Sequence, residues 1–584
     1  MATKDKGLLV KSEITQFREK RDYFRPGKDV KKTIKHLSMR DLKIITLLAI
    51  LGFIQLSLSA QTLNEILGRP TNNSICMSIL FDQKSDVYWE YGVTQGNYIN
   101  TTSTYIAKKD TTLKIDFTNL SPNTKYYYRT RYRLNESSSV FSATAEHSFY
   151  TQRAIGSSFT FTIESDVHLY DKKGILNEYK TCLANQAADK PDFMIDMGDT
   201  YGDDHNPTTI TSGALDSLHK TYRPLLGNIC HSIPYFFCLG NHEGEFNYYY
   251  NQNPPNNLAV MGTLWRKFYY ANPFPNSFYS GNTDVEPYGI GNPENYYAFT
   301  WGNALFVVLD VYRYQCDTSA KPIKWDWTLG SAQYNWLKST LENSTAQYKF
   351  VFAHHVSGQG RGAKVQAKFF EWGGYEQNGV NYTFPSKRPG WAKPIHRLFV
   401  DNGVNIFFQG HDHLFAHEVL DSVIYQEVPM PSDSTYQIGM LANADAYTSD
   451  TIGGSGHLRV SVSPECVKVD FVRAYLPADT ISGTHHNREV AFSYTIGSCS
   501  TVQVSDNKAK ESVKVFPNPV SEKLTLDFPD NLKIYQIQLF NAFGQMVLHT
   551  QSKEIDVSQI SNGLYFLNIK AENTEINKKI IINH

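Results

Sequence analysis

Five short apolar runs in the middle of the chain each end at a group of aspartate, asparagine or histidine residues. The groups are Asp166-Val167-His168, Gly198-Asp199, Gly240-Asn241-His242-Glu243, His354-His355 and Gly410-His411-Asp412-His413. Runs that are apolar on both faces are typical of buried strands in a sheet covered by helices. Because ligands of open α/β sheets gather at the carboxyl ends of strands, the pattern predicts that these polar side chains meet at one sheet edge.

Stretches with a helical pattern lie between the predicted strands. We expect helices over residues 176–188, 212–222, 331–341 and 393–402. Ser331 can cap the third helix, Pro224 lies just beyond the end of the second, and Gly403 ends the fourth. Residues 158–475 are therefore predicted to form an α/β domain, a two-layer β sandwich flanked by helices.

Two long segments rich in aromatic, Asn and Pro residues, 247–257 and 272–297, follow the Asn241 motif. Loops of this length in a compact domain are usually functional. We expect these two loops to wall a substrate cleft.

Residues 68–152 alternate between polar and apolar positions, which predicts a small all-β domain. The segment from Leu120 to Arg129 resembles the turn before a late strand of fibronectin type III domains, where a tyrosine hydroxyl ties the corner. Tyr126 is the candidate for that hydroxyl. The alternative is a generic turn beside an edge strand, and we assign this domain no chemistry.

Residues 1–60 have the pattern of a leader and signal peptide. A basic, polar stretch precedes an apolar core from Ile44 to Ser59, which is followed by small residues. The core is shorter than the ~20 apolar residues that a membrane span needs, although a signal anchor is the alternative. We expect no membrane span in the mature protein. Met39 would begin a conventional signal peptide and is our hypothesis for the initiator; a precursor peptide from residues 1–38 would contradict it.

Composition becomes polar and charged around residues 500–512, so we expect a connecting segment and linker over residues 476–512. Residues 513–584 then form short alternating strands, with Val515-Phe516-Pro517-Asn518-Pro519 at the start and Gly563-Leu564-Tyr565-Phe566 near the end. This tail resembles the C-terminal sorting domain of type IX secretion cargo. The resemblance implies a Gram-negative bacterium, the type IX secretion machinery as a partner, and a secreted or cell-surface protein. The alternative is a small accessory β-sandwich.

Charge and cysteine content narrow the choice of partner and compartment. The chain has 584 residues and a formal net charge of -1, so no nucleic-acid partner or acidic lipid surface is implied. Its seven cysteines are spread without metal-type pairs. One or two disulfides would suit a protein outside the cytoplasm, but their pairing cannot be derived from the sequence.

The ordered set of strand-end motifs over residues 158–475 resembles the calcineurin-like metallophosphoesterase superfamily, which includes the purple acid phosphatases. The resemblance implies two divalent metal ions and hydrolysis of phosphate monoesters by a metal-bound hydroxide. It assigns Asp166, His168, Asp199 and His413 to the first ion, and Asp199, Asn241, His354 and His411 to the second. Asp199 would bridge the two ions, because a carboxylate offers two oxygens and a full charge.

Four further residues are candidates for catalysis or for substrate binding. His242 follows a ligand, and we predict that it contacts phosphate and donates a proton to the leaving oxygen beside the second ion. Glu243 would orient His242 or raise its pKa. His355 and Arg361 are substrate-binding candidates, the latter by holding a phosphate oxygen. The alternatives are a satisfied buried histidine for His242 and a solvated loop arginine for Arg361.

One position departs from the purple acid phosphatases. Those enzymes place a tyrosine three residues after the bridging aspartate as an iron ligand, but Gly202 stands there and Tyr201 comes one residue early. We therefore predict that His168 replaces that ligand and that no ferric-tyrosinate centre forms. Ligation by nitrogen and oxygen without thiolate suits Mn, Fe or Zn.

Two other functions remain open from the sequence. The site could serve a phosphodiesterase or nucleotide hydrolase, since no specificity pocket can be derived from the motifs. The chain could also be a cell-surface binding protein on a lapsed phosphoesterase scaffold. Every expected ligand position is filled, which favours a metal-dependent phosphoric ester hydrolase.

Overall fold

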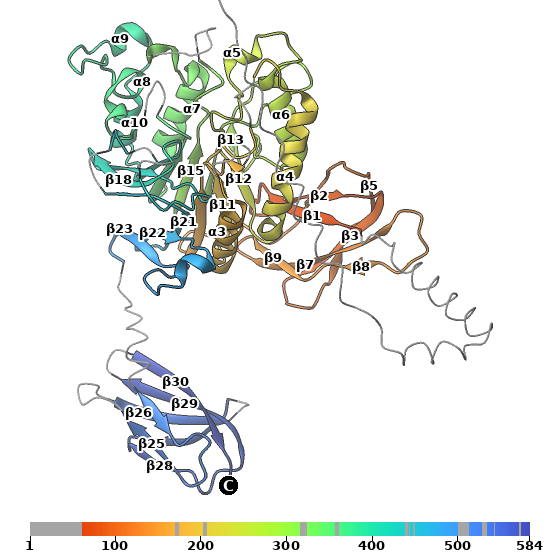
Figure 1. Cartoon of the computed structure of the whole chain (residues 1–584), viewed down its shortest axis with the longest axis vertical. Helices are drawn as coiled ribbons and strands as arrows, with labels where there is room; N and C mark the ends of the chain where they lie inside the picture. Colours follow the sequence, from red (N-terminus) through yellow and green to blue (C-terminus); the bar gives the residue numbers. More distant parts are fainter. Residues whose placement is uncertain are drawn as a thin grey trace, which may run out of the picture. The chain divides into compact units, whose positions relative to one another are not determined.

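The computed structural model describes residues 61–584, apart from residues 170–173, 203–206, 316–323, 357–360, 439–441, 443, 448–449, 500–512, 528–533, 542–543 and 572–573. The predicted signal peptide lies outside the described residues. Figure 1 shows the helices and strands of the described part with the labels used below.

Two mixed sheets form the central part of the structure (Figure 1). The first has nine strands, in the order β23 (Val490–Gly497), β22 (Cys466–Arg473), β21 (Gly456–Val462), β10 (Phe159–Glu164), β11 (Phe193–Asp196), β12 (Tyr235–Phe237), β1 (Leu63–Gly68), β2 (Ile75–Phe81) and β6 (Leu113–Phe117). The second has eight, in the order β13 (Ser280–Gly281), β14 (Tyr297–Trp301), β15 (Ala304–Val308), β16 (Tyr348–Phe352), β17 (Ile406–Gln409), β19 (Val423–Glu427), β18 (Phe415–Leu420) and β20 (Thr451–Ile452).

The five predicted motif strands are present, and they run parallel within their sheets. β10, β11 and β12 are paired in parallel in the first sheet, and β16 and β17 are paired in parallel in the second. Each sheet therefore delivers its motif residues to a single edge.

Aromatic side chains fill the space between the two sheets. Phe161 of β10 is fully buried, and its ring lies 5.1 Å from that of Phe306 and 5.8 Å from that of Phe350, both in the second sheet. Aromatic pairs at such distances contribute about 0.5–1.5 kcal/mol each beyond the area they bury. This core fixes the two sheets against each other and so fixes the strand ends that carry the motifs.

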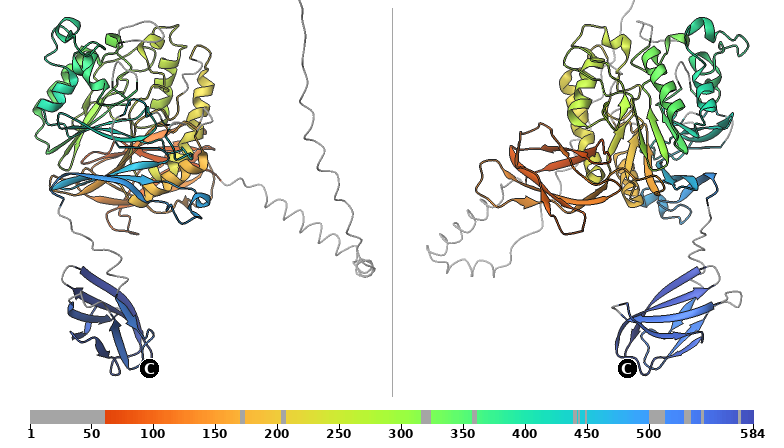
Figure 2. Two further views of the ribbon diagram at one scale, coloured as in Figure 1. Left: turned by 60° about the vertical axis from the view of Figure 1, so that its left-hand side comes forward. Right: turned by 180° about the vertical axis from the view of Figure 1, so that it is seen from behind.

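Helices cover the outer faces of the paired sheets, with α4 and α6 on one side and α7, α8 and α10 on the other (Figures 1 and 2). The longer helices are α3 (Leu176–Asp189), α4 (Ser212–Cys230), α6 (Leu258–Tyr269), α7 (Gly330–Asn343) and α10 (Ile395–Asp401). The short ones are α5 (Asn247–Tyr250), α8 (Phe370–Gly373), α9 (Phe384–Lys387), η4 (Lys324–Asp326), η5 (Gln366–Lys368) and η6 (Pro477–Thr480). The four predicted helices are all present.

Two details of the helix predictions are wrong. α4 continues through Pro224 to Cys230 rather than ending before the proline. An interior proline costs about 3 kcal/mol or more, but the apolar side chains that follow it are buried in the core and offset this cost. Ser331 does not cap α7, because the N-cap residue is Leu329, which makes no side-chain cap bond.

The N-terminal all-β region fits a fibronectin type III-like domain. Besides β1, β2 and β6 it contains β3 (Ser85–Gly92), β4 (Asn100–Thr101), β5 (Tyr105–Ala107), β7 (Lys125–Leu134), β8 (Ser142–Ala143) and β9 (His147–Tyr150). The hydroxyl of Tyr126 accepts a hydrogen bond from the N–H of Ser121 at 2.8 Å, which confirms the predicted tyrosine corner. β1 also pairs with β12 at Gly68 and Tyr235.

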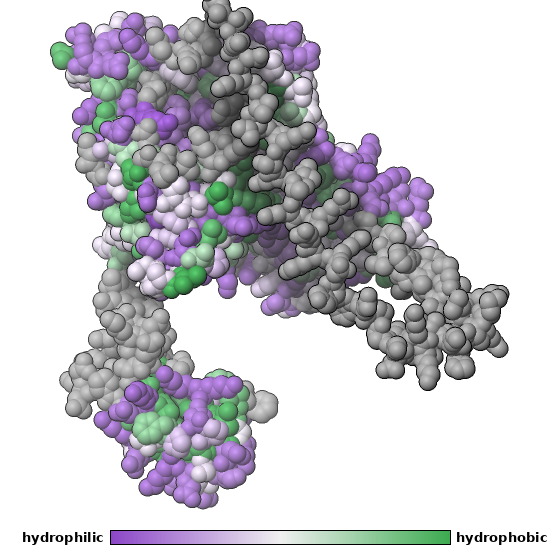
Figure 3. All heavy atoms as spheres, viewed as in Figure 1, coloured by the Kyte–Doolittle hydropathy of each residue, from purple (hydrophilic) through white to green (hydrophobic). Residues whose placement is uncertain are grey.

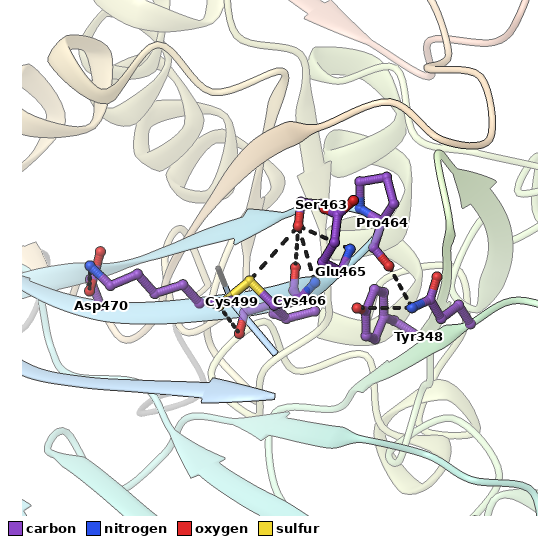
Figure 4. Close-up of a disulfide and its surroundings, with 10 residues drawn as sticks. Tyr348, Ser463, Pro464, Glu465, Cys466, Asp470 and Cys499 are labelled. Atoms are coloured by element: carbon purple, nitrogen blue, oxygen red, sulfur yellow. Dashed lines mark hydrogen bonds and ion pairs between the residues drawn. A yellow bond between two sulfur atoms is a disulfide. The ribbon is translucent and has the colours of Figure 1, made fainter. Parts of the chain in front are cut away.

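The segment after residue 476, which we predicted to be a connection, contains a further strand. β23 pairs with β22 along its length, and a disulfide between Cys466 and Cys499 joins the two (Figure 4). The hydroxyl of Ser463 accepts a hydrogen bond from the N–H of Cys466 at 3.1 Å. The linker prediction is thus reduced to residues 500–512, which lie outside the described residues. Among the described cysteines, four are free and buried: Cys76, Cys182, Cys230 and Cys238.

The C-terminal region is a separate all-β unit with its own core. One of its sheets contains β24 (Lys514–Phe516), β25 (Lys523–Asp527) and β28 (Glu554–Asp556). The other contains β27 (Met546–Thr550), β26 (Ile534–Asn541), β29 (Gly563–Ala571) and β30 (Thr574–Ile582).

Hydrophilic side chains are spread over much of the face shown in Figure 3, with smaller hydrophobic patches between them. Strongly exposed apolar residues such as Ile99, Val285 and Ile481 belong to different regions, and single exposed apolar residues are normal. Within the part of the chain that the structure describes, no helix is long and apolar enough to cross a membrane.

Candidate metal centre

The strand ends bring the predicted donors together from both sheets. Asp166 and His168 follow β10, Asp199 follows β11, and Asn241 and His242 follow β12. His354 follows β16, and His411 and His413 follow β17. Their donor atoms form three overlapping groups: Asp166 with His168 and His413, His168 with Asp199 and His242, and Asp199 with His354 and His411. The predicted meeting of these side chains at one edge is thereby confirmed.

Five of these donors have left-handed backbone conformations. The φ angles are 62° at Asp166, 49° at His168, 57° at Asp199, 79° at His411 and 64° at His413. Such angles are uncommon for residues other than glycine and cost on the order of 1–3 kcal/mol each. Strained residues cluster at functional sites when the surrounding structure holds them in place. The strain at this edge therefore indicates a functional site.

One oxygen of Asp166 is fixed by the chain, while the other faces the histidines. Oδ2 accepts hydrogen bonds from the hydroxyl of Ser165 at 2.6 Å and from the N–H of His411 at 2.9 Å. Gly410 permits this close approach, since a Cβ there would lie 2.6 Å from Oδ2 of Asp166 and 2.0 Å from Oγ of Ser165. Oδ1 is buried and has no hydrogen-bond partner among the described residues.

Three imidazoles surround that unbonded Oδ1 at distances too long for hydrogen bonds. The Nε2 atoms of His413, His168 and His354 lie 3.5, 3.6 and 3.7 Å from it. Two ligands that share one ion at about 2.0–2.2 Å stand roughly 3–3.6 Å apart. The Nε2 atoms of His168 and His413 are 3.0 Å apart, which also suits a shared ion. The residues present therefore fit a divalent metal ion at this position.

Asp199 lies between this group and a second one. Its Oδ2 is 3.1 Å from Nε2 of His354 and 3.9 Å from Nε2 of His168. One end of the Asn241 amide lies 3.3 Å from the same oxygen and 2.8 Å from Nδ1 of His411. An amide oxygen in that place suits an ion shared by the three side chains, whereas an amide nitrogen would donate to both neighbours. Asp199 therefore lies within reach of donors assigned to both ions, and its bridging role stays a prediction.

His354 is held in one tautomer from outside the group. Its Nδ1 lies 2.8 Å from the carbonyl oxygen of Met197, and a proton on Nδ1 leaves Nε2 free to bind a cation. Metal-bound histidines usually donate their second ring N–H in this way. The contact to Met197 could not be derived from the sequence, because the carbonyl belongs to a different strand end.

The electrostatics of the donor set favour a bound cation. Burial alone would raise the pKa of Asp166, but His354 and the other nearby histidines hold it well below its usual range. Burial would lower the pKa of His354, yet Asp199 and Asp166 raise it to about 10. The two carboxylates thus attract positive charge to Nε2 of His354, and a divalent ion competes with a proton for that position.

Glu243 supports the loop that carries Asp199. Its buried carboxylate accepts hydrogen bonds from the N–H groups of Gly240 (2.8 Å), Asp199 (2.9 Å), Thr200 (2.9 Å) and Tyr201 (3.3 Å). Burial raises its pKa to about 7. These contacts indicate that Glu243 positions the Asp199 turn. The predicted action of Glu243 on His242 stays a prediction.

His242 lies at the more open side of the donor set. Its Nε2 is 3.7 Å from Oδ2 of Asp199, with the side chain 20% exposed. Its ring meets that of His168 edge-on, with centroids 4.9 Å apart. We predicted His242 beside the second ion, whereas this contact is with a ligand assigned to the first. Its catalytic role stays a prediction.

The two tentative substrate residues differ in their surroundings. His355 is buried, with its ring 4.8 Å from that of His411, and burial lowers its pKa to about 4. Arg361 is partly exposed and donates from Nη1 to Oδ1 of Asp412 at 3.0 Å. Substrate contact stays a prediction for both, and the guanidinium of Arg361 already has a carboxylate partner.

Tyr201 points away from the donors. Its buried ring lies 4.4 Å from that of His219 and 4.7 Å from that of Phe237, within the core. A Cβ at Gly202 would lie 2.0 Å from the carbonyl oxygen of His242, so no larger side chain fits there. These placements agree with the prediction that Tyr201 does not take the place of the tyrosine ligand, and the absence of a ferric-tyrosinate centre stays a prediction.

Comparisons with known proteins agree with this geometry. Residues 159–415 match the family of calcineurin-like phosphoesterases, and residues 514–583 match the secretion system C-terminal sorting domain. The chain is similar to the structure of PhoD, with 17% identity, a TM-score of 0.52, and coverage of 74% of this chain and 90% of that one. It is also similar to purple acid phosphatase PPD1 from yellow lupin (Lupinus luteus) seeds, with 16% identity, a TM-score of 0.50 and coverage of 75% and 74%. A comparison with curated protein sequences finds no match. At such identities, the likeness to the solved structures concerns the fold.

Proposed function

We propose that this chain, whose residues 159–415 match the calcineurin-like phosphoesterase family, is a secreted phosphomonoesterase that uses two divalent metal ions. The observation that carries the proposal is the surroundings of one buried carboxylate oxygen at the strand ends. Oδ1 of Asp166 is buried without a hydrogen bond among the described residues, and three imidazole nitrogens face it.

The first ion would be held by Asp166, His168, Asp199 and His413, and the second by Asp199, Asn241, His354 and His411. Mn, Fe and Zn all suit such nitrogen and oxygen donors. When bound, two such ions polarise the phosphoryl group and supply an activated water. Asp199 is the donor that belongs to both sets, and Glu243 holds its backbone in place.

Histidine residues of the chain would have different roles in proton transfer. His242 would carry a proton on its imidazole and give it to the leaving oxygen as the P–O bond breaks, since its side chain is buried only in part, with 20% exposed. His354 keeps its Nδ1 directed at Met197 throughout, so it does not exchange protons with the substrate.

A substrate screen tests this proposal. Purified protein reconstituted with Mn, Zn or Fe should hydrolyse simple phosphomonoesters faster than nucleotides or phosphodiesters, and the Asp199→Asn variant should be inactive with all of them. Faster hydrolysis of diesters or nucleotides would show that the enzyme acts on that substrate class and not mainly on phosphomonoesters. A well-folded wild-type protein that binds no metal would favour a binding protein on this scaffold.

The C-terminal sorting domain implies secretion or a cell-surface location. We propose that residues 513–584 serve export alone, because they form a separate unit from the metal centre. A chain truncated before Ser512 should remain folded and active but stay inside the cell. Active truncated enzyme outside the cell or on its surface would contradict this assignment.

A further inference from the structure

The residue between the two histidine donors, Asp412, is anchored on the opposite side from the metal centre. It is fully buried, and its neighbours His411 and His413 both have left-handed backbone angles. A turn with two strained residues needs external support to keep a single conformation. The contacts of Asp412 show where that support comes from.

Three donors from two other segments bind the Asp412 carboxylate. Oδ1 accepts from Nη1 of Arg361 at 3.0 Å. Oδ2 accepts from the N–H of Gly362 at 2.8 Å and from the hydroxyl of Tyr447 at 2.7 Å. The segment of Gly362 also packs against that of Tyr447, because a Cβ on Gly362 would lie 2.7 Å from Cβ of Ala446. Three segments distant in sequence therefore meet at one carboxylate.

The backbone of Asp412 is held as well. Its N–H donates to Oε1 of Glu427 in β19 at 3.0 Å, and Oε2 of the same glutamate accepts from the amide of Gln409 in β17 at 2.6 Å. Glu427 is fully buried. The turn after β17 is thus fixed at both its main chain and its side chain.

We propose that Asp412 is a positioning residue that sets the orientation of both His411 and His413, and that Arg361, Gly362 and Tyr447 form the clamp through which it acts. The inference rests on the proposed metal centre. Because His413 is assigned to the first ion and His411 to the second, loosening this one turn weakens both sites together. Arg361 takes part in the clamp rather than in the binding of phosphate.

Metal titration of matched variants tests the proposal. Contacts behind metal ligands typically alter metal affinity by about 10–100-fold, so Asp412→Asn should weaken binding of both Mn²⁺ ions by that factor in calorimetric titrations of metal-free protein. Tyr447→Phe removes one hydrogen bond without changing charge and should cause a smaller loss in the same direction. Excess Mn²⁺ should restore most of the turnover of both variants.

Asp470→Asn is the matched control. Asp470 is also a buried aspartate paired with an arginine, since its Oδ2 lies 2.8 Å from Nη2 of Arg459, but it belongs to β22. This variant should lower the unfolding temperature and leave Mn²⁺ affinity unchanged. Equal losses of affinity in Asp470→Asn and Asp412→Asn would overturn the positioning role, as would wild-type affinity in Asp412→Asn.

The test separates this inference from the proposed function. If the wild-type protein binds Mn²⁺ but hydrolyses no phosphate ester, the proposed function fails while the affinity comparison still decides the role of Asp412. If the wild-type protein is an active metal enzyme and the Asp412 and Tyr447 variants bind Mn²⁺ as it does, only the positioning role fails.

Discussion

In the part of the chain that the structure describes, aspartate and histidine side chains are buried together both at the strand ends and at the end of α3, but the two clusters differ in character. At the end of α3, Asp189 is bonded to His457, Arg459 and Arg488. Nε2 of His457 lies 2.8 Å from Oδ2 of Asp189, and the arginines lie 3.0 and 2.7 Å from Oδ1. All three are hydrogen-bond distances.

At the strand ends, by contrast, the ion pairs of Asp166 and Asp199 among the described residues are with histidines only. Apart from the 3.1 Å pair of His354 and Asp199, these pairs are 3.5–3.9 Å long. No arginine neutralises these carboxylates in the described part of the chain, and one of their oxygens has no hydrogen bond there. The difference shows that buried Asp and His residues alone do not identify a metal site. The informative feature is a buried carboxylate oxygen, Oδ1 of Asp166, which has no hydrogen-bond partner in the described part of the chain and faces three imidazoles.

The largest expected effect follows from removing the bridging charge. Asp199→Asn should abolish turnover and reduce the occupancy of both metal positions, because both sets of donors share this carboxylate. Phosphatase assays and metal analysis of the same sample measure the two effects. Full turnover in this variant would show that Asp199 does not bridge.

Removal of the proposed acid should have the next largest effect on catalysis. His242→Ala should leave the metals bound and slow turnover by ~10²–10⁴-fold, the usual contribution of a general acid. The loss should be smaller for leaving groups of low pKa, which need no proton. An equal loss for all leaving groups would remove the acid role and leave only positioning.

Substitution in the cluster around Asp189 should change the stability of the protein rather than its activity. Asp189→Ala leaves two arginines and a histidine without their partner, and breaking a buried ion pair costs about 3–5 kcal/mol. Chemical denaturation should show this loss, while metal affinity below the unfolding transition stays that of the wild type. Weaker metal binding without any loss of stability would break the distinction between the two clusters.

The pH dependence of that stability has a defined sign. Burial alone would raise the pKa of Asp189, but His457 and the arginines lower it to about 2, below its value of about 3.9 in an unfolded chain. Its ion pairs therefore stabilise the protein fully above pH ~4, and this contribution is lost as the pH falls towards 2. The stability difference between the wild type and Asp189→Asn should shrink over that range; a constant difference would contradict the assignment.

The smallest expected effect concerns colour. Tyr201 lies in the core beside Phe237, so protein loaded with iron and oxidised in air should show no broad visible charge-transfer band. Tyr201→Phe should leave the absorption spectrum and the metal content unchanged. A visible band that disappears in this variant would show that Tyr201 coordinates iron.

The sequence predicts that these side chains meet, because each one follows a short apolar strand and strand ends are local signals. The buried runs before Asp166, Asp199 and His354 are recognisable without knowledge of the fold. Local signals fail where packing against residues distant in sequence determines where an element begins or ends. Pro224 suggests a helix end, but burial of the residues after it keeps α4 intact.

The support around the centre could not be predicted. Glu243 appears in the motif as a neighbour of His242, yet its carboxylate binds the main chain of the Asp199 turn. From the sequence Arg361 is a candidate for binding phosphate or a solvated loop residue, and neither reading includes its pairing with Asp412, which joins residues 51 positions apart. Such contacts depend on how loops from several strands pack, and no short-range pattern records them. β23 was missed because it is an edge strand whose side chains are largely exposed.

The most direct test of the account is the metal content of the purified wild-type protein. After reconstitution with Mn, Zn or Fe and removal of loosely bound metal, elemental analysis should find two ions per chain, with fewer in Asp199→Asn and an unchanged number in Asp189→Asn. A folded wild-type protein that retains no metal ion under any of these conditions would contradict the metal centre itself.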